Sequence, residues 1–185
     1  ILYQPNNEFN TIFNEILSNS VNYFIISGTN TEWSFLNKSQ SVFSKKYTSQ
    51  LENYNPILNL NYETFQTKNI NFSNFSPLED VFGDVKFSIP INTLLFQQIG
   101  SVKTEKPLLA TFETKNQKGA VLFGENSWKW RMSSFVASKS FEEFDGFISN
   151  LIQYLSSNKI NNRLNVNVES IFNSKSTIQI SENYL

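Results

Sequence analysis

The sequence predicts an α/β domain in which helices pack on a central β-sheet. Three segments carry apolar residues at helical spacing, whereas several short runs are rich in the β-branched and aromatic residues that favour strands. The two kinds of pattern alternate along the chain, which is typical of a layered α/β sandwich. A chain of 185 residues is long enough for one complete hydrophobic core and too short for two.

The N-terminal segment is predicted to contain two strands and two helices. Residues 1–3 are typical of the end of a strand that begins before this sequence. Over residues 8–17 the apolar side chains recur at helical spacing and predict a helix with one buried face: Phe9, Ile12, Phe13, Ile16 and Leu17. A buried strand is expected over residues 21–26. The next apolar residues predict a second helix that includes Trp33, Leu36, Val42 and Phe43.

The middle of the chain shows the weakest periodicity. Residues 47–84 are therefore expected to form an irregular excursion that aromatic side chains hold against the core. Strands are then predicted over four runs, at residues 85–89, 93–99, 108–113 and 120–123. The polar connection between the last two runs is short, which predicts a hairpin. Ser140 and Glu143 match the capping box that begins a helix, and helical spacing of apolar residues continues to Leu155.

The sequence is expected to divide into two parts. Residues 1–160 are predicted to form the α/β domain, which lacks its N-terminal unit because the sequence opens within a strand. Residues 161–185 are predicted to form a β-strand tail. Residues 165–168 and 177–180 alternate in the manner of exposed strands, so we expect a β-hairpin that starts a following β-module.

Composition excludes several classes of function. The 15 Lys and Arg against 16 Asp and Glu give a net charge of −1. Because no basic cluster stands out in the sequence, binding to nucleic acid or to anionic lipid is not expected. The sequence contains no Cys and no His, which excludes disulfides, thiol nucleophiles, Ser-His pairs and Cys/His zinc sites built from this chain. No apolar run approaches the ~20 residues of a membrane span, so membrane insertion is not expected either.

A glycine turn follows the strand predicted over residues 21–26. Ser27, Gly28 and Thr29 lie between that strand and a helix, where free N–H groups bind ligands in many α/β folds. No glycine-rich phosphate-binding pattern surrounds the turn. The structural alternative is that Gly28 only reverses the chain and that Thr31 caps the helix.

Residues 118–132, KGAVLFGENSWKWRM, contain two of the three tryptophans. Trp128 and Trp130 are candidates for stacking on a sugar or a peptide, and Arg131 is a candidate for binding a carboxylate. In the structural alternative, one tryptophan anchors a strand–helix junction while Arg131 lies across an aromatic ring or pairs with Glu125. Trp33 lies on a predicted helical face and is expected in the core.

The carboxylates allow two further hypotheses. Glu125, together with Glu113 or Asp84, is a candidate acid/base pair for hydrolysis. Glu79, Asp80 and Asp84 are candidate Ca²⁺ ligands, although their spacing matches no EF-hand loop. Scattered carboxylates are normally solvated, so neither a cofactor nor a metal ion is expected.

Four stretches of the sequence together resemble a known family: VNYFIISGTNTEWSFLN, QLENYNPILNLNYETF, FSPLEDVFG, and KGAVLFGENSWKWRM before a Phe-rich helix. They resemble the class I glutamine amidotransferase-like domain of large membrane-anchored proteins in Bacteroidetes, which often lies beside von Willebrand factor A-like regions. The resemblance covers about residues 1–160. Its best motif is matched by Lys118-Gly119, by residues 121–124 and by the Trp-X-Trp-Arg corner at residues 128–131.

This resemblance implies a flavodoxin-like α/β sandwich on the extracytoplasmic side of the cell envelope. Active amidotransferases attack glutamine with a Cys on a strand–helix elbow and use a His as base. The position most like that elbow is Ser27-Gly28-Thr29, and the residue after Gly124, where related domains carry a His, is Glu125. With neither Cys nor His in the chain, glutamine hydrolysis by that mechanism is excluded. The resemblance therefore implies a degenerate domain.

Three hypotheses of function follow. The first is a non-catalytic interaction or scaffold domain of a larger cell-envelope protein, whose partners are other domains of the same longer chain or envelope proteins. The second is a module that binds carbohydrate or peptidoglycan fragments through Trp128 and Trp130. The third is a carboxylate-dependent hydrolase, which requires two carboxylates in one pocket.

Overall fold

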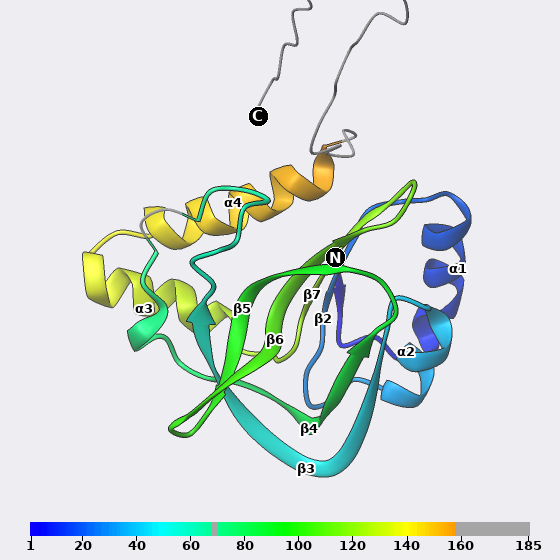
Figure 1. Ribbon diagram of the computed structural model, residues 1–185, viewed down its shortest axis with the longest axis horizontal. Coiled ribbons are helices and arrows are strands. Elements are labelled where there is room, and N and C mark those ends of the chain that lie inside the picture. Colours follow the sequence, from blue (N-terminus) through cyan, green and yellow to red (C-terminus); the bar gives the residue numbers. More distant parts are fainter. Residues whose placement is uncertain (68–69, 158–185) are drawn as a thin grey trace, which may run out of the picture.

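A seven-stranded mixed β-sheet forms the centre of the protein, with helices on two sides of it (Figure 1). The computed structural model describes residues 1–67 and 70–157. Within these ranges the strands are β1 Leu2–Tyr3, β2 Tyr23–Ile26, β3 Phe43–Leu58, β4 Leu78–Phe87, β5 Ile91–Ile99, β6 Val102–Glu113 and β7 Lys118–Leu122. The α-helices are α1 Asn10–Ser18, α2 Trp33–Ser39, α3 Trp128–Ser138 and α4 Glu142–Ser156, and the 3-10 turns are η1 Asn7–Phe9 and η2 Phe72–Asn74.

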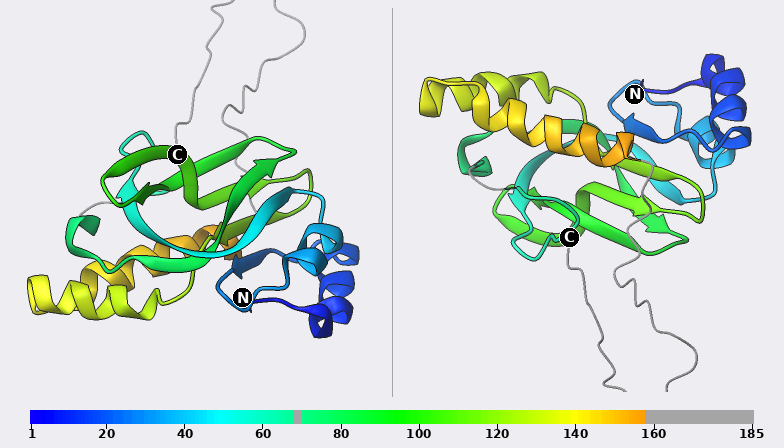
Figure 2. Two further views of the ribbon diagram at one scale, coloured as in Figure 1. Left: turned by 90° about the horizontal axis from the view of Figure 1, so that it is seen from below. Right: turned by 90° about the horizontal axis from the view of Figure 1, so that it is seen from above.

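The strands lie in the order β1-β2-β7-β6-β5-β3-β4. Strands β1, β2 and β7 are parallel, whereas all the other neighbouring pairs are antiparallel. The sheet curls strongly (Figure 2). An isolated antiparallel bridge joins Glu79, near the start of β4, to Glu125, which follows β7. The edge strand β4 therefore returns to the segment that leaves the parallel part of the sheet.

Two pairs of helices pack on the sheet. Helices α1 and α2 contact each other through Phe13 and Phe35, whose rings meet edge to face with centroids 5.6 Å apart. Helix α4 buries Phe147 and Leu151 and exposes Asp145. Its first turn is acidic, which suits the positive end of the helix dipole. Figure 1 shows the α3–α4 pair on one side of the molecule and the α1–α2 pair on the other.

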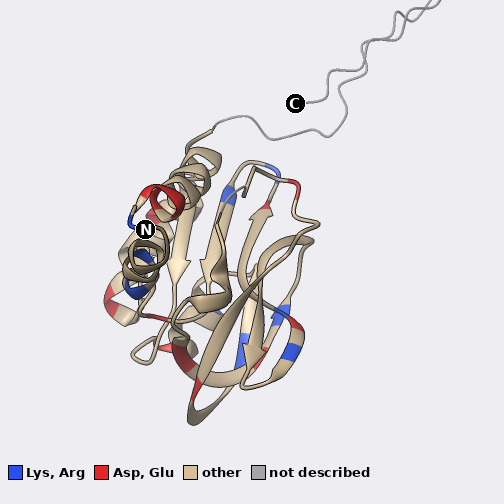
Figure 3. Ribbon diagram, turned by 90° about the vertical axis from the view of Figure 1, so that its left-hand side faces the viewer, with Lys and Arg blue, Asp and Glu red and all other residues tan. Residues whose placement is uncertain are grey.

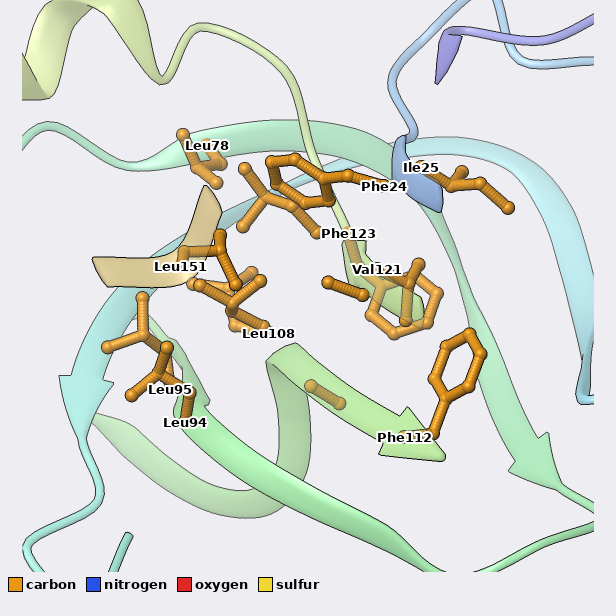
Figure 4. Close-up of a cluster of buried hydrophobic side chains, with 14 of the residues drawn as sticks. Phe24, Ile25, Leu78, Leu94, Leu95, Leu108, Phe112, Val121, Phe123 and Leu151 are labelled. Carbon is orange, nitrogen blue, oxygen red and sulfur yellow. The ribbon is translucent and has the colours of Figure 1, made fainter. Parts of the chain in front are cut away.

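The core is built from apolar side chains that come from opposite parts of the chain. Figure 4 shows one cluster of buried side chains that includes leucines of β4, β5, β6 and α4, Ile25 of β2 and Phe123 of the segment after β7. Phe123 is completely buried, and its ring stacks on Trp33 of α2, with centroids 6.3 Å apart. The same ring meets Phe43 of β3 and Phe87 of β4 edge to face. Phe123 thus joins the helical layer to the curled sheet.

Several predictions from the sequence are confirmed. The protein is a mixed α/β structure with a layered arrangement of helices and sheet. Helices lie where the patterns at residues 8–17 and 140–155 predict them, as α1 and α4. Strands β6 and β7 form the expected hairpin, and Trp33 is in the core, where only 2% of its surface is exposed.

The prediction of an irregular excursion over residues 47–84 is wrong at both ends. Strand β3 continues to Leu58 and strand β4 begins at Leu78. The alternating pattern of β3 is hidden for two reasons. The strand is exposed over most of residues 44–53, and a register shift between Tyr47 and Leu51 interrupts its pairing with β4. Within residues 59–67 and 70–77, which connect the two strands, the 3-10 turn η2 is the one helical element described. Three aromatic side chains of this part are buried, as expected: Tyr62, Phe72 and Phe75.

Two local predictions are also corrected. Helix α2 ends at Ser39, so Val42 and Phe43 are not helical, and Phe43 begins β3. The side chain of Gln40 causes this break, because its amide accepts the N–H groups of Val42 and Phe43 and donates to the carbonyl oxygen of Phe43. The predicted aromatic corner at Trp128 is instead the first turn of helix α3. The predicted tail at residues 161–185 lies outside the described residues.

We predict that Phe123→Ala lowers the free energy of unfolding by about 3–5 kcal/mol, because it leaves a cavity between three other aromatic rings. Denaturant unfolding, followed by tryptophan fluorescence, measures the change. Phe82→Ala is the matched control, since Phe82 is 37% exposed on strand β4. Equal losses in the two variants would contradict the central role of Phe123.

Candidate functional site

The candidate site lies at the carboxyl ends of the three parallel strands. Gln4 follows β1, Thr29 follows the end of β2 and Glu125 follows β7, and hydrogen bonds bring all three residues together. The C-terminal ends of parallel strands are where open α/β sheets place their ligand sites. The topology thus assembles residues that are far apart in the sequence (Figure 1).

The carboxylate of Glu125 is the centre of this site. Its Oε1 accepts the backbone N–H of Thr29 at 3.1 Å and also the Thr29 hydroxyl. Its Oε2 accepts the Gln4 side-chain amide at 2.6 Å and the Tyr3 hydroxyl at 3.2 Å. The backbone of Glu125 pairs with Glu79 in both directions, through N···O distances of 3.0 and 3.4 Å. One residue therefore ties together the ends of β1, β2, β4 and β7.

The pKa of Glu125 follows from these contacts. Partial burial by itself would raise the pKa of the carboxyl group. The hydrogen bonds from Thr29, Tyr3 and Gln4 stabilise the ionised form more strongly, so the pKa is lowered from its ordinary value of 4.5. A carboxylate in this state is an acceptor at neutral pH and a poor general acid.

Glycine makes the close approach at this site possible. A Cβ atom at Gly28 would lie 2.8 Å from the Cβ of Glu125 and 2.9 Å from the Cδ of Gln4. Gly124, with φ of +136°, has no room for a Cβ either, because Leu78 of β4 lies 2.6 Å away. The hydroxyl of Thr31 accepts the N–H of Gly28 at 2.8 Å and closes this turn. The alternative that Thr31 caps helix α2 is corrected, since Glu32 occupies the N-cap position.

A buried ion pair lies beside the Glu125 site, because Asp80 follows Glu79 and its partner Ser27 precedes Gly28. Lys45 of β3 donates to Asp80 Oδ2 at 2.9 Å, and side-chain exposure is 2% for Lys45 and 0% for Asp80. The Ser27 hydroxyl donates to the same oxygen at 2.7 Å. Burial raises the pKa of Asp80, against the opposing charge of Lys45. Burial likewise lowers the pKa of Lys45, against the charge of Asp80.

Sequence reasoning missed this ion pair. Lys45 is flanked by polar or charged neighbours and reads as a solvated residue. The signal that marks it is strand parity, because Phe43 and Lys45 are two residues apart and point to the same buried face of β3. On β4, Asp80 likewise lies two residues after the buried Leu78 and points to the same buried face. Both signals require β3 and β4 to be assigned as strands.

The residues around the two tryptophans have separate roles. Trp130 is 1% exposed and its indole N–H donates to the Ser76 carbonyl oxygen at 2.6 Å. It therefore cannot offer a ring face to a ligand, and the prediction of a two-tryptophan platform is corrected. Arg131 binds both carboxylate oxygens of Asp145, at 2.8 and 2.9 Å, and lies 3.9 Å from the centre of the Phe141 ring. Its predicted aromatic contact is present, but its charge partner is Asp145 and not Glu125.

Helix α3 has an exposed apolar face, which we call the α3 face. Its members are spaced four, three and one residues apart and so lie on one side of the helix: Trp128, Met132, Phe135 and Val136. Their exposed fractions range from 38% to 68%. The ring of Phe135 also stacks on Phe141, with centroids 4.7 Å apart. Contiguous apolar exposure of this kind is typical of protein interaction sites.

The predicted carboxylate pairs and metal ligands do not assemble. Asp84 pairs with Lys106 at 2.7 Å on the surface, and Asp80 is committed to Lys45. In residues 1–67 and 70–157, no group of three or more Asp and Glu side chains is placed to hold a metal ion. Glu113 is paired with Lys118 at the start of β7, whereas Glu125 follows the other end of that strand. Asp84 lies five residues along β4 from Glu79, the residue that is bridged to Glu125. Figure 3 shows acidic and basic residues interspersed over the strands and helices.

Comparisons of the chain with protein-family models, with curated proteins and with solved structures gave no match. Among the helices that the structure describes, none combines the length and the apolar character needed to cross a membrane.

We predict that Lys45→Met lowers the free energy of unfolding by about 3–5 kcal/mol, since it leaves Asp80 buried without a counter-charge. The double variant Lys45→Met/Asp80→Asn should lose less than the sum of the two single losses, because neither buried charge remains. Denaturant unfolding of the four proteins in this cycle measures the coupling. The control is Lys106→Met, which breaks an exposed pair and should cost about 1 kcal/mol or less. Similar losses for Lys45→Met and Lys106→Met would contradict the role of burial.

We also predict that Glu125→Gln lowers stability in a pH-dependent manner. Because the folded pKa of Glu125 is lowered, its ionised carboxylate stabilises the folded state above the ordinary value of 4.5, and this contribution is lost as the pH falls through the folded pKa. The difference in unfolding free energy between the native protein and Glu125→Gln should therefore be largest near neutral pH and shrink in acid. A pH-independent difference for Glu125→Gln would show that its charge is unimportant.

Proposed function

We propose that the protein is a non-catalytic interaction domain of a larger cell-envelope protein and that it binds its partner through the α3 face. The observation that carries this proposal is a difference in availability: the candidate residues with polar groups are bonded inside the protein, whereas apolar side chains of α3 are exposed. Glu125, Arg131 and Trp130 are all engaged in internal hydrogen bonds. Trp128 and Val136, by comparison, are 65% and 68% exposed.

The chemistry of the α3 face indicates the kind of partner. Lys129 lies beside Trp128, with its Nζ 5.7 Å from the ring centre, and Lys139 follows the C-terminal end of the helix. Within the described part of the chain, neither lysine forms an ion pair. A protein surface that presents apolar side chains flanked by carboxylates would complement this face. Other domains of the same longer chain, or envelope proteins, are the partners that we propose.

The flavodoxin-like assignment belongs to the same proposal. Strand β1, helix α1 and strand β2 form a β-α-β unit whose strands are adjacent and parallel. Strand β7 adds a third parallel strand beside β2. This part of the sheet supports the proposed kinship with degenerate amidotransferase-like domains, and the extracytoplasmic location follows from that kinship alone.

One observation favours a second candidate function, the binding of carbohydrate or peptidoglycan fragments. The Trp128 ring is exposed, and an exposed indole is a common stacking surface for sugars. On this hypothesis, glycans shift the tryptophan fluorescence and Trp128→Ala abolishes the shift. No shift across a broad glycan panel would leave the protein-binding function as the better account of the α3 face.

The docking proposal predicts a position-specific cross-link. A photo-reactive amino acid at Val136, within the full-length protein in its own cells, should give a discrete product with one protein surface. Val102 in the β5–β6 hairpin is the matched control, because it is 64% exposed and lies far along the chain from α3. Met132→Asp should abolish the Val136 product, since it places a charge in the apolar contact. Identical products from positions 136 and 102 would contradict the proposal.

The absence of catalysis is tested separately. We expect the purified chain to turn over no ester, amide or glycoside beyond the level of Glu125→Gln. Turnover that is lost in Glu125→Gln would favour the hydrolase hypothesis and overturn the non-catalytic one.

A further inference from the structure

The contacts of Glu125 have an asymmetry that bears on ligand binding. All four donors come from the ends of β1 and β2, on Tyr3, Gln4 and Thr29, whereas the carboxylate that they bind comes from the segment after β7. The donors and the carboxylate of Glu125 thus belong to different parts of the chain. The backbone of Glu125 is fixed independently of these donors, by its bridge to Glu79. Rotation of the Glu125 side chain would free the donors without moving either backbone.

Gln4 and the turn that contains Thr29 are held in place without the help of Glu125. In that turn the Thr31 hydroxyl accepts the N–H of Gly28, and the Gly28 carbonyl oxygen accepts the N–H of Thr31. The N–H of Gln4 donates to the Ile26 carbonyl oxygen at 2.7 Å, and the side-chain Oε1 of Gln4 accepts the N–H of Asn30 at 2.8 Å. Because that oxygen is engaged, the amide nitrogen of Gln4 faces the carboxylate. Gln4 also has a φ of +44°, a left-handed conformation that is uncommon outside glycine and that often marks functional sites.

The donor set selects a particular chemical group. Two donors serve one carboxylate oxygen and two serve the other, so the arrangement fits a planar group with two oxygens. All four donors are neutral, which suits a single negative charge better than a phosphate dianion. Gly28 leaves the required space, since a Cβ there would fill the position next to the occupant.

We propose that Tyr3, Gln4 and Thr29 form a carboxylate-binding site and that Glu125 occupies it in the resting protein. A ligand carboxylate binds to the same four donors when the Glu125 side chain rotates out. Glu125 is then a built-in competitor, which raises the ligand concentration needed for binding. The site is independent of the α3 face, so the failure of either proposal leaves the other standing.

Removal of the competitor provides the test. In the chain carrying Glu125→Ala, sodium acetate should raise the thermal midpoint with a saturating dependence, by about 2–4 °C for each kcal/mol of binding free energy gained. Sodium chloride at matched ionic strength, sodium phosphate, and acetate with the native protein should each raise it much less. Glu105→Ala, which removes an exposed carboxylate from β6, should respond to acetate like the native protein.

The donors themselves are tested in the Glu125→Ala background. Adding Thr29→Val removes a hydroxyl donor at nearly constant shape and should abolish most of the acetate effect. Three outcomes overturn the proposal: an acetate effect no larger than that of chloride, an equal effect in Glu105→Ala, or an effect that survives Thr29→Val.

If Glu125→Ala does not fold, the same titration is made on Glu125→Gln and followed by the amide NMR signal of Thr29. A saturable shift larger than in the native protein supports the site, and its absence rejects it.

Discussion

The structure depends on one carboxylate that closes a curled sheet. Glu125 has its side chain bonded to the ends of β1 and β2 and its backbone bonded to β4, while it is itself the continuation of β7. Next to Glu79, the buried carboxylate of Asp80 accepts hydrogen bonds from the Ser27 hydroxyl and from Lys45. The hydrogen-bonded carboxylate of Glu125 and the buried Lys45–Asp80 ion pair therefore stabilise the same junction between the ends of β2, β4 and β7. Hydrogen bonds to charged groups are the stronger ones, so the junction resists opening more than a neutral turn would.

The sequence predicted the parts of the fold in which local pattern and tertiary environment agree. Helix α4 has one continuous apolar face, so its position and its buried side follow from the spacing of its apolar residues. The predicted capping box is not formed as expected, because Phe141 is at the N-cap position and Ser140 accepts the N–H of Glu142. Strand β2 is recognisable because nearly all of it is apolar. The mixed α/β class follows from the alternation of such segments, but the sheet order does not. Pairing between β2 and β7 joins residues about one hundred positions apart, and no local signal encodes it.

The sequence analysis named three residues of the candidate site and missed two others, Tyr3 and Gln4. Gly28, Thr29 and Glu125 do meet, because all of them lie at the carboxyl ends of parallel strands. Trp128, Trp130 and Arg131 follow Glu125 closely in the sequence, but no hydrogen bond among the described residues joins them to this site. A helix places consecutive residues on different faces, so Trp130 points into the core while Trp128 points outward. Helix α3 itself was missed because it has apolar residues on both faces and hence no clear helical period.

The position of β7 in the sheet also sets an order of assembly. This strand lies between β2 and β6 and is the last of the described strands in the sequence. During synthesis, β2 has only the two-residue β1 beside it until residues 118–122 leave the ribosome. The antiparallel part, from β3 to β6, is by then already available to pair with itself. The long-range contacts between β2 and β7 are thus made late, and the edge of β2 stays unpaired until β7 has been synthesised.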